Sequence, residues 1–468
     1  MSSTQQQSVF SLDGATDTLV AWVVDSITAE LPAPVEHHIR RLLVDYLAAV
    51  VPGSTTEVAR AVASHVAATY GATRSNSATG VGLGQVSAPG AALLNGTSCH
   101  SLEVDDGYTP GSVHPSSVSF PAVLAAAEAL GSDTIRTTRA LAVALEATSR
   151  LAAAGHPTTW RNHFHNTPLA GVIGATCGVA VLHGLDADQL HHALGIAASH
   201  AGGLFAFLGK SAEVKRVHPG KAARDAITSV ELAVAGVTGP RAILETPHGY
   251  VDAFAAGGFD AGVLLDGLGR EWVVLNSYVK PYPSCRHLHG PLDAVLALRA
   301  EHGIGLDDVA DATVRTYTVA SHHAAKVVDS LLDAQMSIPF ALATALANDE
   351  VGLTEFGQEA RHDKEIRDFA TRVEVVADAK ADSEYPRLRP ATVELRLRDG
   401  RSVAQRVELP YGEPGNPVSD AEMTAKFVRL ATPVLGAEFA EQVVTELWAF
   451  ESLDVIARID TQVRNKQR

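Results

Sequence analysis

Residues 168–182 read PLAGVIGATCGVAVL, a run without any charged side chain in which glycine recurs every three or four residues. This spacing puts Gly171, Gly174 and Gly178 on one face of a helix, where the missing side chains let a second helix approach closely. The run is shorter than the ~20 residues that a membrane span requires. It therefore predicts a buried helix at the centre of a helical domain.

Polar residues flank this apolar run on both sides. His163 and His165 precede it, and a basic cluster follows it, made of Lys210, Lys215, Arg216, His218 and Lys221. Pro219 suits the first turn of a helix, so we predict a helix from there to about residue 235 whose free N–H groups favour an anion. A solvated charged turn is the alternative for the cluster. A metal site at the two histidines is disfavoured, because no Cys or His motif of standard spacing supplies further ligands.

The composition is that of a globular protein with more than one core. The chain has 468 residues, 46% of them hydrophobic, and a formal net charge of -16, which argues against nucleic acid as a partner. Its cysteines, Cys99, Cys177 and Cys285, are odd in number and far apart, which favours a reducing compartment. The first ten residues lack the pattern of a signal peptide. We therefore expect a cytoplasmic protein without a membrane partner.

The periodicity of apolar residues changes along the chain. Helical spacing dominates residues 14–70 and continues through several further segments to about residue 235. Alternating segments follow at 312–319, 372–379 and 391–409, and Asp399-Gly400 inside the last one predicts a hairpin. Helical spacing returns from residue 418. The sequence thus predicts a mainly α protein, with a helical domain at 1–273, a smaller α+β domain at 274–408, and a C-terminal part at 409–468 that rejoins the first domain.

An acidic loop between residues 103 and 117 is a second candidate site. Glu103, Asp105 and Asp106 lie close together, and neighbouring like charges raise one another's pKa, which would prepare one of them to act as a base. His114 adds an imidazole to the same loop just before a helix. A solvated turn or a helix cap is the plain alternative for the acidic residues alone.

A third candidate lies in the stretch KPYPSCRHLH, residues 280–289. Its two prolines make a rigid turn that delivers Ser284 and Arg286 to a helix start, an arrangement that suits carboxylate binding together with Lys280. Cys285 could be a nucleophile, but no Cys-His-Asn arrangement is evident, and a buried structural thiol is the better interpretation.

In order and spacing, these motifs resemble the MmgE/PrpD family over about residues 15–455. The segments that carry the resemblance are 95–100, 103–115, 164–167, 184–186, 215–223, 236–240 and 280–285. The acidic loop departs from the family's common Asp-Phe-Asp-Asp-Thr, because this chain has EVDDG at residues 103–107. The decarboxylase branch of the family has a tyrosine in the smaller domain where ungapped counting places His322.

The resemblance implies a helical domain built from both chain ends, an α+β lid, a homodimer, and neither a metal nor another cofactor. It also implies small di- or tricarboxylates as substrates. The expected catalytic residues are Glu103, Asp105, Asp106, His114, His165 and Lys215. The expected substrate-binding residues are His218, Lys221, Lys280, Ser284, Arg286 and His322.

The chemistry shared by the family is removal of a proton next to a carboxylate. An acidic-loop residue or His165 would take the proton, and His114 or Lys215 would return one to the leaving group. We expect a dehydratase similar to 2-methylcitrate dehydratase. The alternatives are a decarboxylase acting on cis-aconitate, an epimerase of the iminodisuccinate type, and a carboxylate-binding protein without catalysis.

Overall fold

A computed structural model describes residues 11–73, 76–209, 212–348 and 350–467. The chain divides into two compact units. Unit 1 comprises residues 1–101, 105–277 and 419–468, and unit 2 comprises residues 102–104 and 278–418. Unit 1 is almost entirely helical, and unit 2 combines helices with a sheet, which confirms the predicted mainly α fold with a smaller α+β part.

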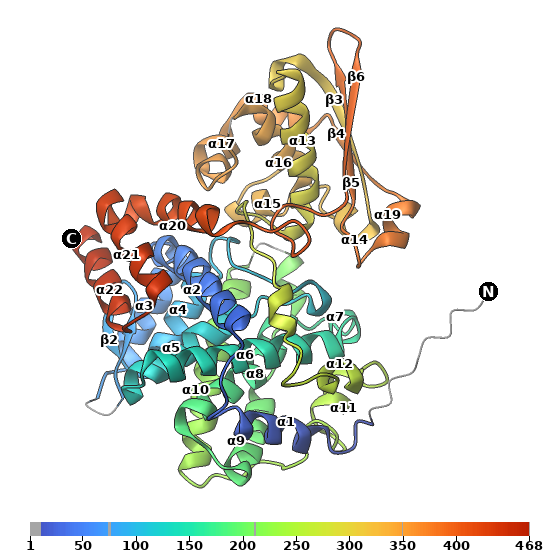
Figure 1. Cartoon of the computed structure of the whole chain (residues 1–468). Coiled ribbons are helices and arrows are strands. Elements are labelled where there is room, and N and C mark those ends of the chain that lie inside the picture. Colours follow the sequence, from blue (N-terminus) through green and yellow to red (C-terminus); the bar gives the residue numbers. More distant parts are fainter. Residues whose placement is uncertain (1–10, 74–75, 210–211, 349, 468) are drawn as a thin grey trace. The chain divides into compact units, whose positions relative to one another are not determined.

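The long helices of unit 1 enclose a central one, and their bounds follow (Figure 1). They are α1 (Ala15–Asp25), α2 (Ala33–Gly53), α3 (Glu57–Thr69), α4 (Ala88–Cys99), α5 (Ser116–Leu130), α6 (Thr134–Gly155), α8 (Asn166–His183), α9 (Ala187–His200) and α10 (Val214–Val234). Shorter helices are α7 (Thr158–Arg161), α11 (Tyr250–Ala255) and α12 (Ala261–Leu265), and β1 (Ala78–Gly80) pairs with β2 (Gly84–Val86) in a small antiparallel hairpin.

Helix α8 is the apolar run of residues 168–182 with a short polar start, and it packs against α5, α6 and α10. Its glycines allow this packing. A Cβ at Gly174 would lie 2.1 Å from Thr148 Oγ1 of α6, and one at Gly178 would lie 2.6 Å from the Ala140 carbonyl oxygen. By length and composition α8 could cross a membrane, but 94% of its apolar window is buried inside the protein. It is therefore a core helix of unit 1.

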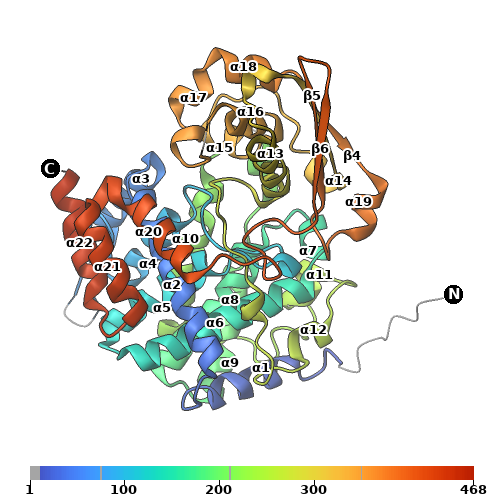
Figure 2. The same cartoon turned by 45° about the horizontal axis from the view of Figure 1, so that its top comes forward.

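The C-terminal helices belong to the same unit as the N-terminal ones. These are α20 (Asp420–Leu435), α21 (Ala437–Ala449) and α22 (Asp454–Gln467). Helix α20 packs along α2, as Figure 2 shows, and a buried ion pair joins Lys426 Nζ to Asp45 Oδ1 at 2.5 Å. Both ends of the chain therefore contribute to one helical core.

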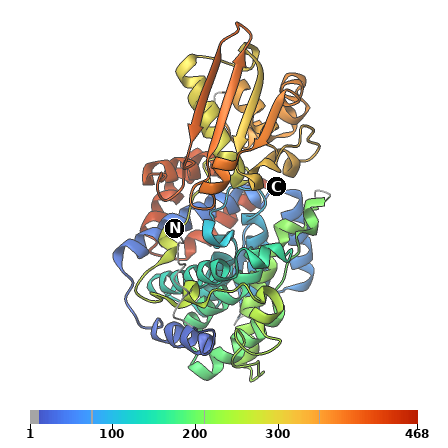
Figure 3. The same cartoon turned by 90° about the vertical axis from the view of Figure 1, so that its right-hand side faces the viewer.

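Unit 2 contains a four-stranded sheet in the order β4-β3-β5-β6 (Figure 3). The strands are β3 (Val309–Thr316), β4 (Val373–Ala377), β5 (Ala391–Leu397) and β6 (Ser402–Val407), with β3 and β4 parallel and the other pairs antiparallel. The predicted hairpin joins β5 to β6, and Gly400 adopts a φ of 92° there. Buried residues alternate along β5, as expected for a sheet with one face on a core.

Helices accompany this sheet in unit 2, and their bounds follow. They are α13 (His289–His302), α14 (Thr318–Ser321), α15 (Leu331–Gln335), α16 (Ile338–Ala347), α17 (Gln358–His362), α18 (Lys364–Ala370) and α19 (Ala379–Glu384). Helices α13 and α16 pack against each other, and α13 also lies on β5 and β6. Leu292, Val295, Phe340 and Val393 are among the fully buried side chains of this core.

Candidate active site

The loop from Asp105 to Pro115 is held against the start of α8 by side-chain hydrogen bonds. The His114 backbone N–H donates to Thr167 Oγ1 at 3.1 Å, and the Asn166 amide donates to the Gly111 carbonyl oxygen at 2.7 Å. Within the loop, His114 Nδ1 lies 2.6 Å from the Asp106 carbonyl oxygen, which can only accept, so Nδ1 carries a proton. The loop therefore presents His114 in a defined orientation.

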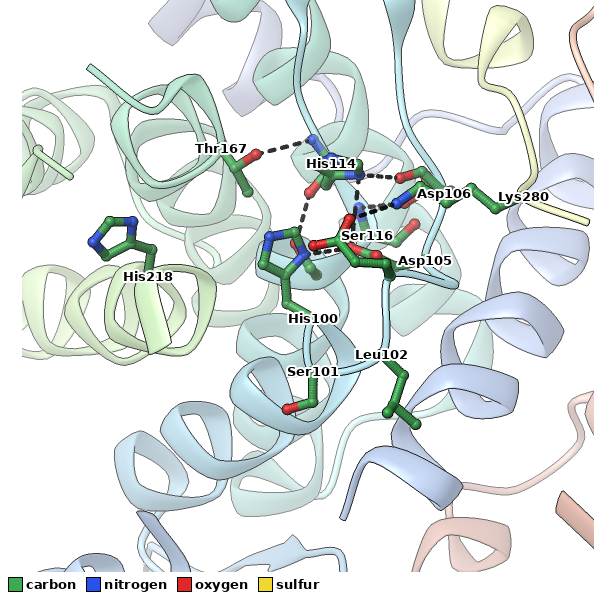
Figure 4. Close-up of polar contacts among 12 residues, drawn as sticks. His100, Ser101, Leu102, Asp105, Asp106, His114, Ser116, Thr167, His218 and Lys280 are labelled. Carbon is green, nitrogen blue, oxygen red and sulfur yellow. Dashed lines mark hydrogen bonds and ion pairs between the residues drawn. The ribbon is translucent and has the colours of Figure 1, made fainter. Parts of the chain in front are cut away.

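Asp105 and His100 form a fully buried pair in unit 1. His100 directly follows α4, and its Nδ1 lies 2.7 Å from Asp105 Oδ2, with both side chains at 0% exposure. The Asp105 carboxylate is also 3.7 Å from His114 Nδ1 (Figure 4). On the far side of the His100 ring, Nε2 is buried and has no hydrogen-bond partner among the described residues. The dyad thus leaves one imidazole nitrogen available.

His165 joins the same group through the backbone that precedes α8. Its N–H donates to the Gly203 carbonyl oxygen at 2.9 Å, and the Phe205 N–H donates to the His163 carbonyl oxygen at 3.0 Å. These bonds belong to a short antiparallel bridge between Phe164 and Leu204, which precedes α8. The His165 side chain is buried there, with 4% of its surface exposed. His163 adopts a φ of 68°, and its main role here is to make this turn.

Four imidazoles form a row. The ring centroids of His114 and His100 are 5.0 Å apart, those of His100 and His165 are 5.9 Å apart, and those of His165 and His218 are 5.5 Å apart. His165 Nδ1 lies 3.2 Å from His218 Nδ1, so one nitrogen donates and the other accepts. Phe207 packs on the last two rings.

Burial decides the charge of the last two imidazoles. It lowers the pKa of His165 well below its usual value, and the charges of His100 and His218 add to the effect. Burial, with further repulsion from His100 and Lys221, lowers the pKa of His218 to about 4. Both rings are therefore neutral near pH 7 and act through hydrogen bonds.

Asp106 differs from its neighbour Asp105. Its side chain is fully buried, and burial together with the negative charge of Asp45 raises the pKa of the Asp106 carboxyl well above its usual value. Oδ1 accepts the Ser116 backbone N–H at 3.2 Å, which opposes the rise without reversing it. Oδ2 has no partner among the described residues. Burial therefore favours the neutral form of the Asp106 carboxyl group.

The basic cluster lies in α10, but the predicted start of that helix is wrong. The helix begins at Val214, so Lys215 and Arg216 occupy its first turn and Pro219 lies inside it. Pro219 was expected in the first turn because a residue without an N–H costs nothing there. The close crossing with α4 keeps the helix continuous through a residue that supplies no N–H. Lys210 lies outside the described residues.

The cations of this cluster have different surroundings. Lys215 is 6% exposed on the same helix as His218. Arg216 pairs with Glu213 at 2.6 Å. Lys221 Nζ donates to the His200 carbonyl oxygen at 2.8 Å and lies 3.6 Å from Asp225. Lys221 therefore holds α10 to the end of α9, while the charge of Lys215 acts on His165 and helps to lower its pKa.

The acidic loop is shared between the two units. Glu103 belongs to unit 2 and adopts a φ of 56°, whereas Asp105 and Asp106 belong to unit 1. In unit 2 the Glu103 carboxylate lies 3.1 Å from Lys280 Nζ, and both side chains are buried. The expected acidic trio is therefore divided, and Glu103 balances the charge of Lys280.

Arg286 is buried inside unit 2 by several partners. Nε donates to Glu413 at 3.0 Å, Nη1 donates to His289 Nδ1 at 2.8 Å, and the guanidinium also donates to the carbonyl oxygens of Pro410 and Tyr411. These bonds position the start of α13. The neighbouring Ser284 hydroxyl is buried and has no partner among the described residues, which leaves it available to a ligand.

His322 and its neighbour His323 have different surroundings in unit 2, and substrate binding by His322 stays a prediction. His322 is exposed, whereas His323 Nε2 lies 3.9 Å from Cys285 Sγ. Burial acts to raise the pKa of the Cys285 thiol, but the charge and hydrogen bond of His323 outweigh it and bring this pKa to about 7. His287 completes this group, with its Nδ1 2.5 Å from the Tyr317 hydroxyl.

Two groups of side chains in the described part of the chain have metal-ligand geometry. In each, one ligand atom per residue lies within 4.8 Å of the others. One is His100, Asp105 and His114, and the other is Cys285, His287 and His323. In the first group His100 is hydrogen-bonded to Asp105, and His114 Nδ1 lies 3.7 Å from the same carboxylate. Independence from a metal stays a prediction from the resemblance.

The structure thus gathers Asp105, Asp106, His114, His165 and Lys215 in unit 1, together with His218. It places the expected residues of the 280–289 stretch in unit 2. His100 and His323 were not among the site residues expected from the sequence, whereas His287 belongs to the stretch expected to bind a carboxylate. His100 stands only five residues before Asp105, which was a possible sequence signal for their pairing. The hydrogen bond between them depends on a turn of the intervening backbone, which the composition of that segment does not predict.

Comparisons with known proteins agree with this architecture. The MmgE/PrpD N-terminal domain model matches residues 17–261, and the MmgE/PrpD C-terminal domain model matches residues 282–449. The cis-aconitate decarboxylase of Aspergillus terreus is 26% identical over 448 residues, which cover 90% of each chain. The cis-aconitate decarboxylase of Homo sapiens is 25% identical over 460 residues, covering 91% of this chain and 89% of the human one. The chain therefore belongs to the MmgE/PrpD family and is a MmgE/PrpD-type lyase.

Proposed function

We propose that this lyase removes a proton next to a carboxylate of a small di- or tricarboxylate and expels a hydroxyl group, as a dehydratase. The observation that carries the proposal is the buried dyad of Asp105 and His100, whose outer nitrogen has no partner among the described residues. Homodimer formation, metal independence and a cytoplasmic location remain predictions from the family resemblance and the sequence.

His100 is the base in this proposal. A carboxylate can only accept, so the 2.7 Å contact with Asp105 places the imidazole proton on Nδ1 and leaves a lone pair on Nε2. Asp105 also stabilises the imidazolium that forms when Nε2 takes a proton, which is the role of the carboxylate in a Ser-His-Asp triad. His165 fits this role less well than the sequence suggested, because its low pKa and its bond to His218 favour a neutral hydrogen-bonding group.

Asp106 supplies the acid. Its raised pKa keeps the carboxyl group protonated near neutral pH, and Oδ2 is the oxygen that does not accept from Ser116. In the proposed step the carbon–hydrogen bond breaks and His100 Nε2 takes the proton. The carbon–oxygen bond then breaks, and the leaving hydroxyl takes the Asp106 proton and departs as water. The His100 proton returns to Asp106 through solvent before the next turnover.

Lys215 and the neutral imidazoles bind the substrate. Lys215 lies in the first turn of α10, where a positive side chain and the free N–H groups of the helix favour a carboxylate. His165 and His218 are neutral, and one N–H of the pair is used in the bond between them, so the other ring keeps one N–H that can donate to the substrate without adding charge. Such fixed donors stabilise the negative charge that develops on the carboxylate when the neighbouring carbon loses its proton.

Decarboxylation is the second candidate, because the relatives that match this chain over most of its length carry the name cis-aconitate decarboxylase. The same base and cations would then stabilise the carbanion formed by loss of carbon dioxide. Epimerisation, and carboxylate binding without catalysis, are the remaining alternatives. The reaction products distinguish all four.

The test is a panel of citrate-, aconitate- and aminodicarboxylate-type acids incubated with the protein in deuterated water and followed by NMR. Dehydration produces a new alkene, decarboxylation releases carbon dioxide, epimerisation changes only the configuration and deuterium content, and simple binding leaves the acid unlabelled. A panel in which an acid binds and none exchanges deuterium would establish the non-catalytic alternative.

Variants of the dyad test the mechanism with the substrate that the panel identifies. His100→Gln and Asp105→Asn should each lower kcat by about 10²–10⁴-fold, because they remove the base or its orienting carboxylate. The matched control is His362→Gln, which changes an exposed histidine of unit 2. If His100→Gln retained wild-type kcat, His100 could not be the base.

A further inference from the structure

Cys285, His287 and His323 come together in unit 2 from two segments of the chain. Cys285 and His287 lie in the turn before α13, and His323 follows α14. One ligand atom from each lies within 4.8 Å of the other two. We propose that these three side chains form a binding site for a thiolate-preferring divalent transition-metal ion, with Zn²⁺ as the reference ion. The dehydratase proposal does not use this group.

Backbone hydrogen bonds fix the positions of the two segments relative to each other. The Cys285 N–H donates to the Gln335 carbonyl oxygen at 2.9 Å, and the Ile338 N–H donates to the His323 carbonyl oxygen at 2.9 Å. Both bonds reach the short segment between α15 and α16. Since the cysteine and the distant histidine are tied to the same segment, their separation is set by the fold of unit 2 and does not depend on an ion.

Each histidine has a hydrogen-bond partner of the type that orients metal ligands. His323 Nδ1 donates to the Met336 carbonyl oxygen at 3.0 Å, which puts the lone pair on Nε2, the atom that faces Cys285 Sγ. His287 Nδ1 lies 2.5 Å from the Tyr317 hydroxyl, and Tyr317 is itself held by stacking on Tyr385 at 4.3 Å. With Nδ1–H donated to the phenol oxygen, His287 also offers Nε2. Such outer partners fix the tautomer of metal-binding histidines.

The distances suit a tetrahedral ion. With Zn–S near 2.3 Å and Zn–N near 2.0 Å, a tetrahedral site separates sulfur from nitrogen by about 3.5 Å. Cys285 Sγ and His323 Nε2 are 3.9 Å apart, so a small side-chain rotation brings both onto an ion. All three residues are partly exposed, which allows an ion to enter. Sulfur and imidazole together favour Zn²⁺ over Mg²⁺ or Ca²⁺.

Three protein ligands leave a fourth position open to water or a small anion. Two guanidinium groups of unit 2, those of Arg286 and Arg389, share one carboxylate, Glu413, at 3.0 and 3.9 Å. One carboxylate does not neutralise two guanidinium groups, so the surroundings favour an anionic fourth ligand. The other candidate trio, His100, Asp105 and His114, lacks sulfur, so the two sites differ in their spectra.

The experiment is a titration of the metal-free full-length protein with Co²⁺, followed by absorption spectroscopy and displacement by Zn²⁺. Thiolate coordination adds a sulfur-to-cobalt charge-transfer band in the near ultraviolet. We expect one equivalent of Co²⁺ to produce this band in the wild type, Cys285→Ser to abolish it, and His323→Gln to weaken binding at least 10-fold. Tyr317→Phe should weaken binding about 10–100-fold through the orientation of His287.

The matched control is His322→Gln, because it removes an exposed imidazole adjacent to His323 and should leave the band and its affinity unchanged. A second measurement covers the case in which a variant fails to fold: Zn²⁺ should protect Cys285 of the wild-type protein from alkylation by iodoacetamide, with the modified peptide identified by mass spectrometry. Absence of both the charge-transfer band and zinc protection in the wild type would overturn the proposal. So would a band that survives in folded Cys285→Ser.

Discussion

A single methyl group at Gly220 should separate the two helices that carry the proposed site. Gly220 lies in α10, and a Cβ there would be 2.1 Å from the Leu93 carbonyl oxygen of α4 and 2.8 Å from Thr97 Oγ1. Gly96 faces it from α4, where a Cβ would be 2.6 Å from the Gly220 Cα. The nearest obstacle is backbone, which cannot rotate away, so Gly220→Ala must move the two helices apart by roughly 1 Å.

The expected cost follows from two opposing effects. Replacing glycine by alanine inside a helix favours the helix by about 1 kcal/mol. Forcing an extra carbon into a close-packed crossing costs typically about 1–3 kcal/mol, and more where backbone must shift. Since the 2.1 Å contact is with a carbonyl oxygen, we expect a net loss of about 2 kcal/mol in the free energy of unfolding of unit 1. Chemical denaturation followed by circular dichroism measures it.

The same displacement should affect catalysis. His218 lies two residues before Gly220 on α10, and His100 follows the last residue of α4. A misplacement of about 1 Å between reacting groups can lower the rate by about 100-fold. The control is Gly71→Ala, because a Cβ at Gly71 would meet no atom within 4 Å. If the free energy of unfolding of Gly220→Ala lay within about 0.5 kcal/mol of the wild-type value, the crossing of α4 and α10 would not be close enough to exclude a methyl group. If the variant kept the wild-type kcat, the spacing of these helices would not control the site.

Three further predictions concern charge. Burial lowers the pKa of His218 to about 4, whereas a histidine of the unfolded chain has a pKa near 6.5, so the unfolded chain binds more protons between these pH values. The free energy of unfolding should therefore fall as the pH drops from about 6.5 to 4. His218→Asn should reduce this pH dependence, measured by urea denaturation at pH 7 and pH 5. Glu103→Gln should destabilise unit 2 by on the order of 3 kcal/mol, because it leaves the buried Lys280 ammonium without its carboxylate partner Glu103. Adding Lys280→Met should recover part of this loss, because it removes the buried charge. A double variant no more stable than Glu103→Gln would contradict this. Asp106→Asn should keep the unfolding midpoint, because it replaces one neutral buried group by another. It should abolish product formation, because an amide cannot protonate the leaving hydroxyl. A large loss of stability would show that the carboxyl group is ionised in the folded protein.

Local patterns were sufficient for much of the architecture. The apolar period of 3.6 residues located most helices of unit 1, and the alternation in residues 391–409 with Asp399-Gly400 located the β5–β6 hairpin. The glycine spacing in residues 168–182 predicted the close packing of α8. These features depend on neighbours within a few residues, so the sequence alone contains them. The predicted start of α10 was wrong, because the packing of α10 on α4 outweighs the preference of proline for the first turn of a helix.

The residue types of the site were also visible in the sequence, and several of the expected residues meet in unit 1. Their roles were not visible, because those roles depend on which partner each side chain faces. The positive φ of Glu103 turns that carboxylate to Lys280, while Asp105 turns to His100. His322 and His323 are adjacent in the sequence, but the His323 side chain contacts Cys285 and the His322 side chain is exposed.

Apolar periodicity and residue types along the chain predicted a mainly α fold with a smaller α+β part, together with a set of acids, histidines and a lysine suited to carboxylate chemistry. The partners of each side chain depend on the fold. Asp105 accepts from His100, while burial and the charge of Asp45 raise the pKa of the adjacent Asp106 carboxyl group. Two consecutive residues of the same type thus acquire opposite roles, because the pKa of a carboxyl group depends on its burial and on the charges and donors that the fold places around it.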